Sequence, residues 1–138
     1  MRSGSAPVSG VVVRRVRREE LAAIVEIERR TFSDPWSMSA FAAALARDEV
    51  HFTVAELGPA RDADDVHPAG YLVAWFVGDE AEIGNVAVDD RCRGRGIGTA
   101  LLDEALEAAA RAGVRDIYLE VRESNAPARA LYASRAFT

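Results

Sequence analysis

The sequence predicts a mixed α/β domain with a twisted sheet that is antiparallel at first and ends in two parallel strands. Apolar runs rich in β-branched and aromatic residues at 51–57, 71–77 and 81–88 follow one another through turn-forming segments, which is typical of antiparallel hairpins. An apolar-periodic helix separates 81–88 from the next such run, at 115–122, and a strand–helix–strand connection makes these two strands parallel. The 138 residues, 49% of them hydrophobic, suffice for one domain with a core.

The first third of the chain predicts a strand and two helices. Residues 11–16 are mostly valine and suit a first strand. Residues 19–31 suit a helix, because four positions spaced i, i+3, i+4 and i+7 share one face and three of them are apolar: Leu21, Ile24, Val25 and Glu28. Pro35 cannot continue this helix, and Ser37 can cap a second, short one.

The remaining elements complete this plan. Residues 58–68 are polar and carry two prolines, which predicts a surface loop between the second and third strands. The helix after the fourth strand is predicted to end at Gly113, because glycine is favoured just beyond a helix C-terminus. Asn125 is a natural N-cap for a last helix, and Phe137 begins what should be another strand.

Composition restricts the class of protein. Residues 1–10 are small and polar, so we expect a loose tail rather than a signal peptide, with a single domain at 11–138. The apolar runs are too short to span a bilayer, so no membrane association is expected. The net charge of −5 argues against a nucleic-acid-binding protein. A single cysteine, Cys92, excludes an internal disulfide and fits a cytoplasmic location, and the two histidines form no metal-binding motif.

A glycine-rich stretch follows the fourth predicted strand and opens the next helix. Gly94, Gly96 and Gly98 clear side chains from this loop, so that several backbone N–H groups can point outward together. The first N–H groups of the helix lack intrahelical acceptors, and the positive end of its dipole favours an anion. Positive charge around this position is added by three arginines: Arg91, Arg93 and Arg95. The stretch therefore suits a phosphate or diphosphate.

The glycines alone leave other interpretations open. A Walker A loop would require Gly-Lys-Ser or Gly-Lys-Thr, and the chain contains no lysine. A dinucleotide-binding fold would place the glycines after the first strand rather than the fourth. A purely structural turn between strand and helix explains the glycines equally well.

Three side chains near the C-terminus are candidates for acid–base chemistry or ligand contact. Glu120 lies between Leu119 and Val121 on a strand that should be covered on both faces, and burial raises the pKa of a carboxyl toward the range of a general base. An outward-facing carboxylate explains it as well. Tyr132 can donate a proton to a leaving thiolate or simply pack on the core. Asn125 is explained by capping but can also reach a ligand. Cys92 has no histidine nearby in the sequence, so we interpret it as a bystander thiol.

Five segments together resemble one protein family. They are 34–37 (Asp-Pro-Trp-Ser), 85–88 (Asn-Val-Ala-Val), 93–98 (Arg-Gly-Arg-Gly-Ile-Gly), 118–125 (Tyr-Leu-Glu-Val-Arg-Glu-Ser-Asn) and 130–132 (Ala-Leu-Tyr). In this combination the chain resembles the RimI-type ribosomal-protein-alanine N-acetyltransferases of the GNAT superfamily, from about Val12 to the C-terminus. The glycine pattern marks GNAT enzymes in general, whereas segment 118–125 together with Asp-Pro-Trp-Ser marks a much smaller group of enzymes.

The resemblance implies a GNAT acyl-CoA N-acyltransferase fold, in which the parallel fourth and fifth strands splay around acetyl-CoA as co-substrate, without a metal. Backbone groups of the fourth strand would hold the pantetheine arm and the thioester: Val86, Ala87 and Val88. A second set of residues would bind the diphosphate and the neighbouring groups of the cofactor: Arg93, Gly94, Arg95, Gly96, Ile97, Gly98, Thr99 and Asn125. Glu120 would accept a proton and Tyr132 would donate one. The peptide would bind at Asp34, Pro35 and Trp36.

The resemblance implies acetylation of the N-terminal alanine amine of a small-subunit ribosomal protein, with other N-termini possible. We expect the protein to be a monomer or a weak dimer. Two departures from the family pattern matter. Ala136 stands where the family usually has glycine, and the chain ends at Thr138, where relatives continue with two more strands. Two alternatives therefore stay open: acetylation of a lysine side chain or small amine, and an acetyl-CoA-binding module without turnover.

Overall fold

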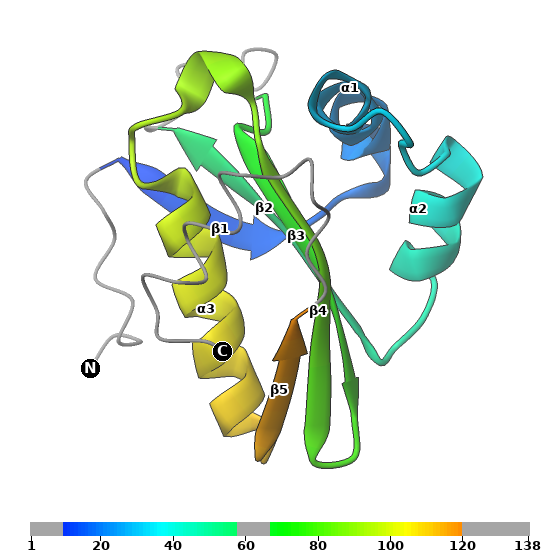
Figure 1. Ribbon diagram of the computed structural model, residues 1–138, viewed down its shortest axis with the longest axis vertical. Helices are drawn as coiled ribbons and strands as arrows, with labels where there is room; N and C mark the ends of the chain where they lie inside the picture. The colour runs from blue at the N-terminus through cyan, green and yellow to red at the C-terminus, as the bar shows by residue number, and fades with distance from the viewer. Residues whose placement is uncertain (1–9, 58–66, 120–138) are drawn as a thin grey trace.

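The computed structural model describes residues 10–57 and 67–119, which form one five-stranded sheet in the order β1-β2-β3-β4-β5 (Figure 1). The strands are β1 (Val11–Arg15), β2 (Val50–Leu57), β3 (Gly70–Val77), β4 (Glu80–Val88) and β5 (Asp116–Leu119). The first four pair antiparallel, and β4 pairs with β5 in parallel. The predicted mixed sheet is therefore confirmed.

The helices cover both faces of this sheet. They are the short 3₁₀ turns η1 (Arg18–Glu20) and η3 (Asp90–Cys92) and the α-helices α1 (Leu21–Thr31), α2 (Met38–Leu45) and α3 (Ile97–Arg111). Helices α1 and α2 lie against one face, and α3 lies against the other (Figure 1). The predicted helix at 19–31 thus begins as a 3₁₀ turn, and Gly113 has the expected left-handed conformation, with φ 84°. In the described residues, no helix has the length and apolar character that crossing a membrane requires.

Two apolar layers, one on each face, form the core. The layer under α1 and α2 includes the fully buried residues Ile24, Phe41, Phe52, Val54 and Val73. The layer under α3 includes Leu72, Ile83, Val86, Leu101 and Leu102. Successive strand residues point to opposite faces, so a continuous apolar run such as that of β3 supplies both layers at once.

A β-bulge in β4 changes which side chains face which layer. Val73 pairs with Asn85 but Ala74 pairs with Ile83, so Gly84 is the extra residue. In a regular strand Asn85 would share the apolar α3 face with Ile83, and the bulge turns it to the opposite face instead. The indole of Trp75 covers Gly84, where an added Cβ would lie only 2.1 Å from the ring. A side chain at this position would force the Trp75 ring to shift, so glycine is favoured here. The sequence predicts a regular strand at 81–88, so the bulge is a feature that the structure adds.

The fifth strand is covered less completely than expected. Ile117 and Leu119 pack on the α3 layer, but Asp116 and Tyr118 are exposed, the latter with 54% of its surface accessible. The expectation that this strand is covered on both faces is therefore wrong for its described part, because α1 and α2 lie over β2 to β4 and leave this edge open. The predicted last helix and the strand at Phe137 lie outside the described residues.

Candidate active site

The middle of β4 is held rigidly on both faces of the sheet. Val86 and Val88 pack on the α3 layer, and Ala87 packs on the layer under α1 and α2. The backbones of Val86 and Ala87 run antiparallel to β3. On the other side of β4, the described pairing with β5 runs from Glu80 to Ile83. A backbone held in this way can present its amide and carbonyl groups to a ligand in a defined geometry.

The glycine-rich loop ends in a helix N-terminus that has no side-chain cap. Gly94 and Gly96 have φ values of 83° and 77°, a left-handed conformation that favours glycine. Gly96 is the N-cap of α3 and offers no side-chain acceptor. The first intrahelical hydrogen bond runs from Ala100 N–H to the Gly96 carbonyl, 3.0 Å. The three preceding amides, of Ile97, Gly98 and Thr99, come before this bond and so lie where an anion can accept from them.

Asp89 holds the start of this loop through hydrogen bonds that the sequence does not predict. Its carboxylate is buried and accepts from the Arg91 backbone amide at 3.0 Å and from the Arg91 guanidinium at 2.7 Å. Arg30, on α1, lies 3.7 Å away. The hydrogen bond from the Arg91 side chain is the main cause that lowers the pKa of Asp89 from 3.8 to about 2. Arg91 is thus engaged with Asp89, whereas Arg93 and Arg95 are exposed and form no ion pair within the described part of the chain.

The loop between α1 and α2 carries the three residues predicted to bind substrate. Asp34 and Pro35 are exposed and Trp36 is half-buried. The Trp36 ring lies 5.2 Å from Phe41 and 6.0 Å from Trp75 (centroid distances), so the loop rests on an aromatic cluster above the sheet. Trp36 therefore links the exposed loop to the core.

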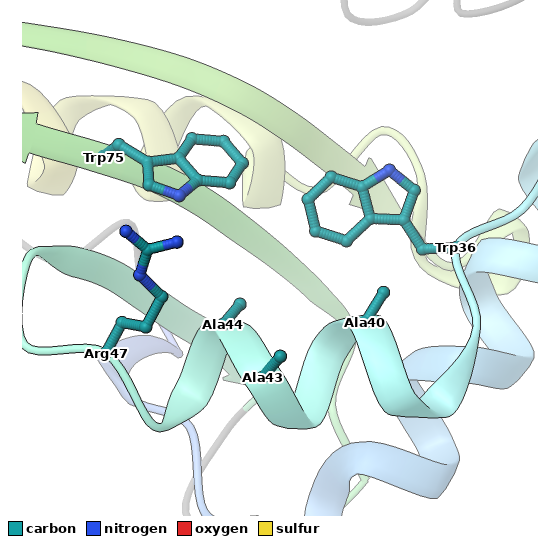
Figure 2. Close-up of a pocket in the computed structure, with 6 residues that line it drawn as sticks. All are labelled: Trp36, Ala40, Ala43, Ala44, Arg47 and Trp75. Atoms are coloured by element: carbon teal, nitrogen blue, oxygen red, sulfur yellow. The ribbon is translucent and has the colours of Figure 1, made fainter.

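An apolar groove of about 280 Å³ lies beside this loop (Figure 2). The indoles of Trp36 and Trp75 form one side, and the small side chains of α2 face them from the other. Arg47 stands at the end near Trp75. The α2 residues that line the groove are Ala40, Ala43, Ala44 and Arg47. The alanines leave room that larger side chains would fill.

A buried polar cluster joins α1, β3, β4 and the α1–α2 loop. Glu28 and Tyr71 are fully buried, and Asn85 is 3% exposed. Glu28 accepts hydrogen bonds from the Tyr71 hydroxyl, from the Asn85 amide nitrogen at 2.7 Å and from the Trp36 backbone amide at 2.8 Å. This cluster is not predicted from the sequence, although Glu28 is the one charged residue on the apolar stripe of its helix.

Three of the remaining predicted residues lie in parts of the chain that the structure does not describe. Glu120, Asn125 and Tyr132 lie outside the described residues. Cys92 is a free thiol, partly buried against the α3 layer. His51 Nε2 lies 2.8 Å from Glu104 Oε1, and the imidazole ring stacks on the ring of Phe76. Within the ranges 10–57 and 67–119, no group of three or more potential metal ligands comes together.

Comparison with known proteins identifies the relatives of this arrangement. The acetyltransferase (GNAT) family model matches residues 21–137. The chain is 36% identical over 121 residues to a putative ribosomal protein bS18-alanine N-acetyltransferase of Bacillus subtilis, covering 87% of this chain and 76% of the relative. It is 35% identical over 118 residues to the Escherichia coli ribosomal protein bS18-alanine N-acetyltransferase, covering 86% and 74%.

A solved structure agrees with the sequence relationship. The crystal structure of the ribosomal-protein-S18-alanine N-acetyltransferase from Escherichia coli superimposes with a TM-score of 0.77 at 30% identity, covering 93% of this chain and 77% of that one. Its fold, like the family match, accounts for the parallel β4–β5 pair and the helices on both faces. The chain therefore belongs to the GNAT family of N-acetyltransferases.

Proposed function

We propose that this acetyltransferase moves the acetyl group of acetyl-CoA to the N-terminal α-amine of a peptide, with the N-terminal alanine of a ribosomal protein as the first candidate. The observation that carries the proposal is the continuous path from the middle of β4 to the uncapped N-terminus of α3. Relatives at 35–36% identity are named for alanine N-acetylation of ribosomal protein bS18, which supports the same substrate class here. We further propose that residues 11–138 work as a single domain.

In this proposal the glycine-rich loop holds the diphosphate of acetyl-CoA. The amides at the start of α3 donate to it, and Arg93 and Arg95 add charge from exposed positions. Backbone groups of the Val86–Val88 segment hold the pantetheine arm, and an amide of this strand stabilises the oxyanion that forms on the thioester carbonyl. Asn125 adds a further contact. The chemistry requires no metal.

The proposed reaction is a direct attack without an acyl-enzyme. The neutral α-amine attacks the thioester carbon, a C–N bond forms and the C–S bond breaks. Glu120 accepts the proton released by the nitrogen, and Tyr132 returns a proton to the CoA thiolate. An α-amine has a pKa near 8 against about 10.4 for lysine, so much more of it is neutral at physiological pH. A single carboxylate base therefore suffices for an N-terminus.

The proposed peptide site is the loop at Asp34, Pro35 and Trp36. The exposed Asp34 carboxylate supplies negative charge near an incoming ammonium group. The apolar groove between Trp36, Trp75 and α2 supports a path for the residues that follow the N-terminal alanine. An extended peptide there would pack its side chains against two indoles.

A substrate panel tests the proposal. Acetyl transfer to an alanine-starting peptide should exceed transfer to an N-terminally blocked lysine peptide at the same pH, measured by mass spectrometry. Faster transfer to lysine would favour the side-chain alternative. Acetyl-CoA binding measured by calorimetry without any transfer would favour the binding module.

Replacement of the proposed base tests the mechanism separately. Glu120→Gln keeps the shape of the side chain but cannot accept the proton, so kcat should fall by about 100-fold or more. The Kd for acetyl-CoA should stay within about twofold, since the proposed diphosphate contacts are elsewhere. An unchanged kcat would exclude Glu120 as the base.

A further inference from the structure

Glu28 is a buried carboxylate with no role in the mechanism above. It lies on the core face of α1, one turn after Ile24, and neither residue has measurable exposed surface. Removing a carboxylate from water is costly unless its oxygens accept hydrogen bonds. The stability of a buried glutamate at such a position therefore depends on the donors that bind its carboxylate.

The two carboxylate oxygens bind different parts of the molecule. Oε1 accepts from the Tyr71 hydroxyl and from Asn85 Nδ2 at 2.7 Å, and these two partners are themselves 3.3 Å apart. Oε2 accepts from the backbone amide of Trp36 at 2.8 Å. One carboxylate thus joins the β3–β4 pair to the loop between α1 and α2.

The two ends of this connection lie in or next to the proposed binding sites for the peptide and the thioester. Trp36 belongs to the loop proposed to bind the peptide, and Asn85 directly precedes the β4 segment proposed to hold the thioester. We propose that Glu28 is a positioning residue that sets the peptide loop at a defined distance from the acetyl-bearing strand. This inference rests on the proposed function. A misplacement of about 1 Å between reacting groups can lower the rate about 100-fold, so such a connection affects turnover as well as binding.

The chemistry of the cluster specifies a carboxylate. All three of its described partners donate, and a carboxylate accepts through both oxygens. Glutamine at position 28 would keep the shape but turn an NH₂ group toward one set of donors. Either the Trp36 amide or the Tyr71–Asn85 pair would then lose its acceptor. Since hydrogen bonds to a charged acceptor are the stronger ones, the loss should be measurable.

Glu28→Gln tests the inference by separating the two substrates. We expect the KM for an alanine-starting peptide to rise about tenfold, because the peptide loop is no longer held in its binding position, with a lower kcat. The Kd for acetyl-CoA, measured by calorimetry, should stay within about twofold, because the diphosphate loop is untouched. Hydrogen exchange at the Trp36 amide, followed by NMR, should become faster in the absence of any substrate.

Two further variants separate positioning from general destabilisation. Ile24→Val removes one buried methylene from the same face of α1, destabilises the helix packing and leaves the carboxylate in place. Tyr71→Phe removes one donor from Oε1, while Asn85 still donates to Oε1 and Trp36 to Oε2, so it should raise the peptide KM in the same direction as Glu28→Gln but by less. Ile24→Val should keep the peptide KM within about twofold of the wild-type value.

The outcomes distinguish this inference from the proposed function. An unchanged peptide KM in Glu28→Gln, with an active wild-type enzyme, overturns the positioning role alone. An equal loss in Ile24→Val overturns it as well, because stability would then explain the effect. A wild-type enzyme that acetylates no peptide overturns the proposed function and, with it, the role of Glu28.

Discussion

Helices α2 and α3 begin in opposite ways. At α2 the Ser37 side chain accepts a hydrogen bond from the Ala40 amide at 3.1 Å, so a side chain satisfies one of the free donors. At α3 the N-cap is Gly96, in a left-handed conformation and with no side-chain acceptor. Both helices start with the same unpaired N–H groups. One start is closed by the protein itself, and the other leaves its donors available to an anionic ligand.

The packing of the two helices explains why only one of them needs a cap. Helix α2 has eight residues, of which only Phe41 and Ala44 are buried. Helix α3 has fifteen residues and five buried side chains: Ile97, Leu101, Leu102, Ala105 and Ala109. A short helix with little burial is marginal without a cap, whereas a long, well-packed one tolerates an open end. The stability that α3 gains from its core face thus allows its first turn to remain without a side-chain cap.

The largest effect is expected when the start of α3 is closed like that of α2. Gly96→Asp places a carboxylate where it can accept from the first-turn amides and repel the diphosphate. The Kd for acetyl-CoA should rise by about 100-fold, equivalent to about 2.7 kcal/mol, measured by calorimetry.

Gly96→Asn is the matched control for that variant. Asparagine has the shape of aspartate without its charge, and both tolerate the left-handed conformation. It should weaken binding by about tenfold or less. Equal losses in the two variants would show that charge is not the cause, and normal binding in both would place the cofactor elsewhere.

A smaller effect, on stability alone, is expected at the closed end. Ser37→Ala removes the acceptor for Ala40 and should lower the free energy of unfolding by about 1 kcal/mol, measured by denaturant titration. The acetyl-CoA Kd should not change. A large loss of cofactor affinity in this variant would contradict the division between a structural and a ligand-binding helix start.

The 3₁₀ turn η3, which precedes α3, is intermediate between these two helix starts, because its N-cap, Asp89, carries a charge. Asp89 accepts from the Arg91 amide, and its pKa is lowered to about 2 by Arg91. A carboxyl with a lowered pKa in the folded state contributes stability that is complete above 3.8 and lost as the pH falls through about 2.

Asp89→Asn should therefore be less stable than the wild type at pH 6, and the difference should shrink toward pH 2. The effect should be smaller than that of Ser37→Ala, because Arg91 is exposed to solvent. Thermal unfolding across this pH range measures it. A difference that grows on acidification would contradict the assigned direction of the pKa shift.

The smallest effect is expected from the exposed charges around the open helix start. Arg95→Gln should raise the acetyl-CoA Kd about threefold at low salt, because the side chain acts at a distance through solvent. At about 0.5 M salt the difference should disappear through screening. Calorimetry at two ionic strengths measures this, and a loss independent of salt would indicate a direct, desolvated contact instead.

Most of the secondary structure follows from local patterns in the sequence. The apolar run of β3, the i, i+3, i+4, i+7 stripe of α1 and the cap at Ser37 depend on neighbours within a few residues, so they are visible in the sequence. The three glycines of the loop are also visible in the sequence, but the left-handed conformations of Gly94 and Gly96 are known only from the structure. The parallel β4–β5 pairing also follows, because a helix connects the two strands.

The tertiary structure alone decided three features of the candidate site. At the bulge, the ring of Trp75 from the neighbouring strand occupies the space that a side chain at Gly84 would need. The hydrogen bonds of Glu28 join residues 8, 43 and 57 positions away. The ion pair of the buried Asp89 carboxylate with Arg30, on α1, joins residues 59 positions apart. Periodicity in a sequence shows which face of an element is buried, but the partners across that face come from distant segments, and only packing brings them together.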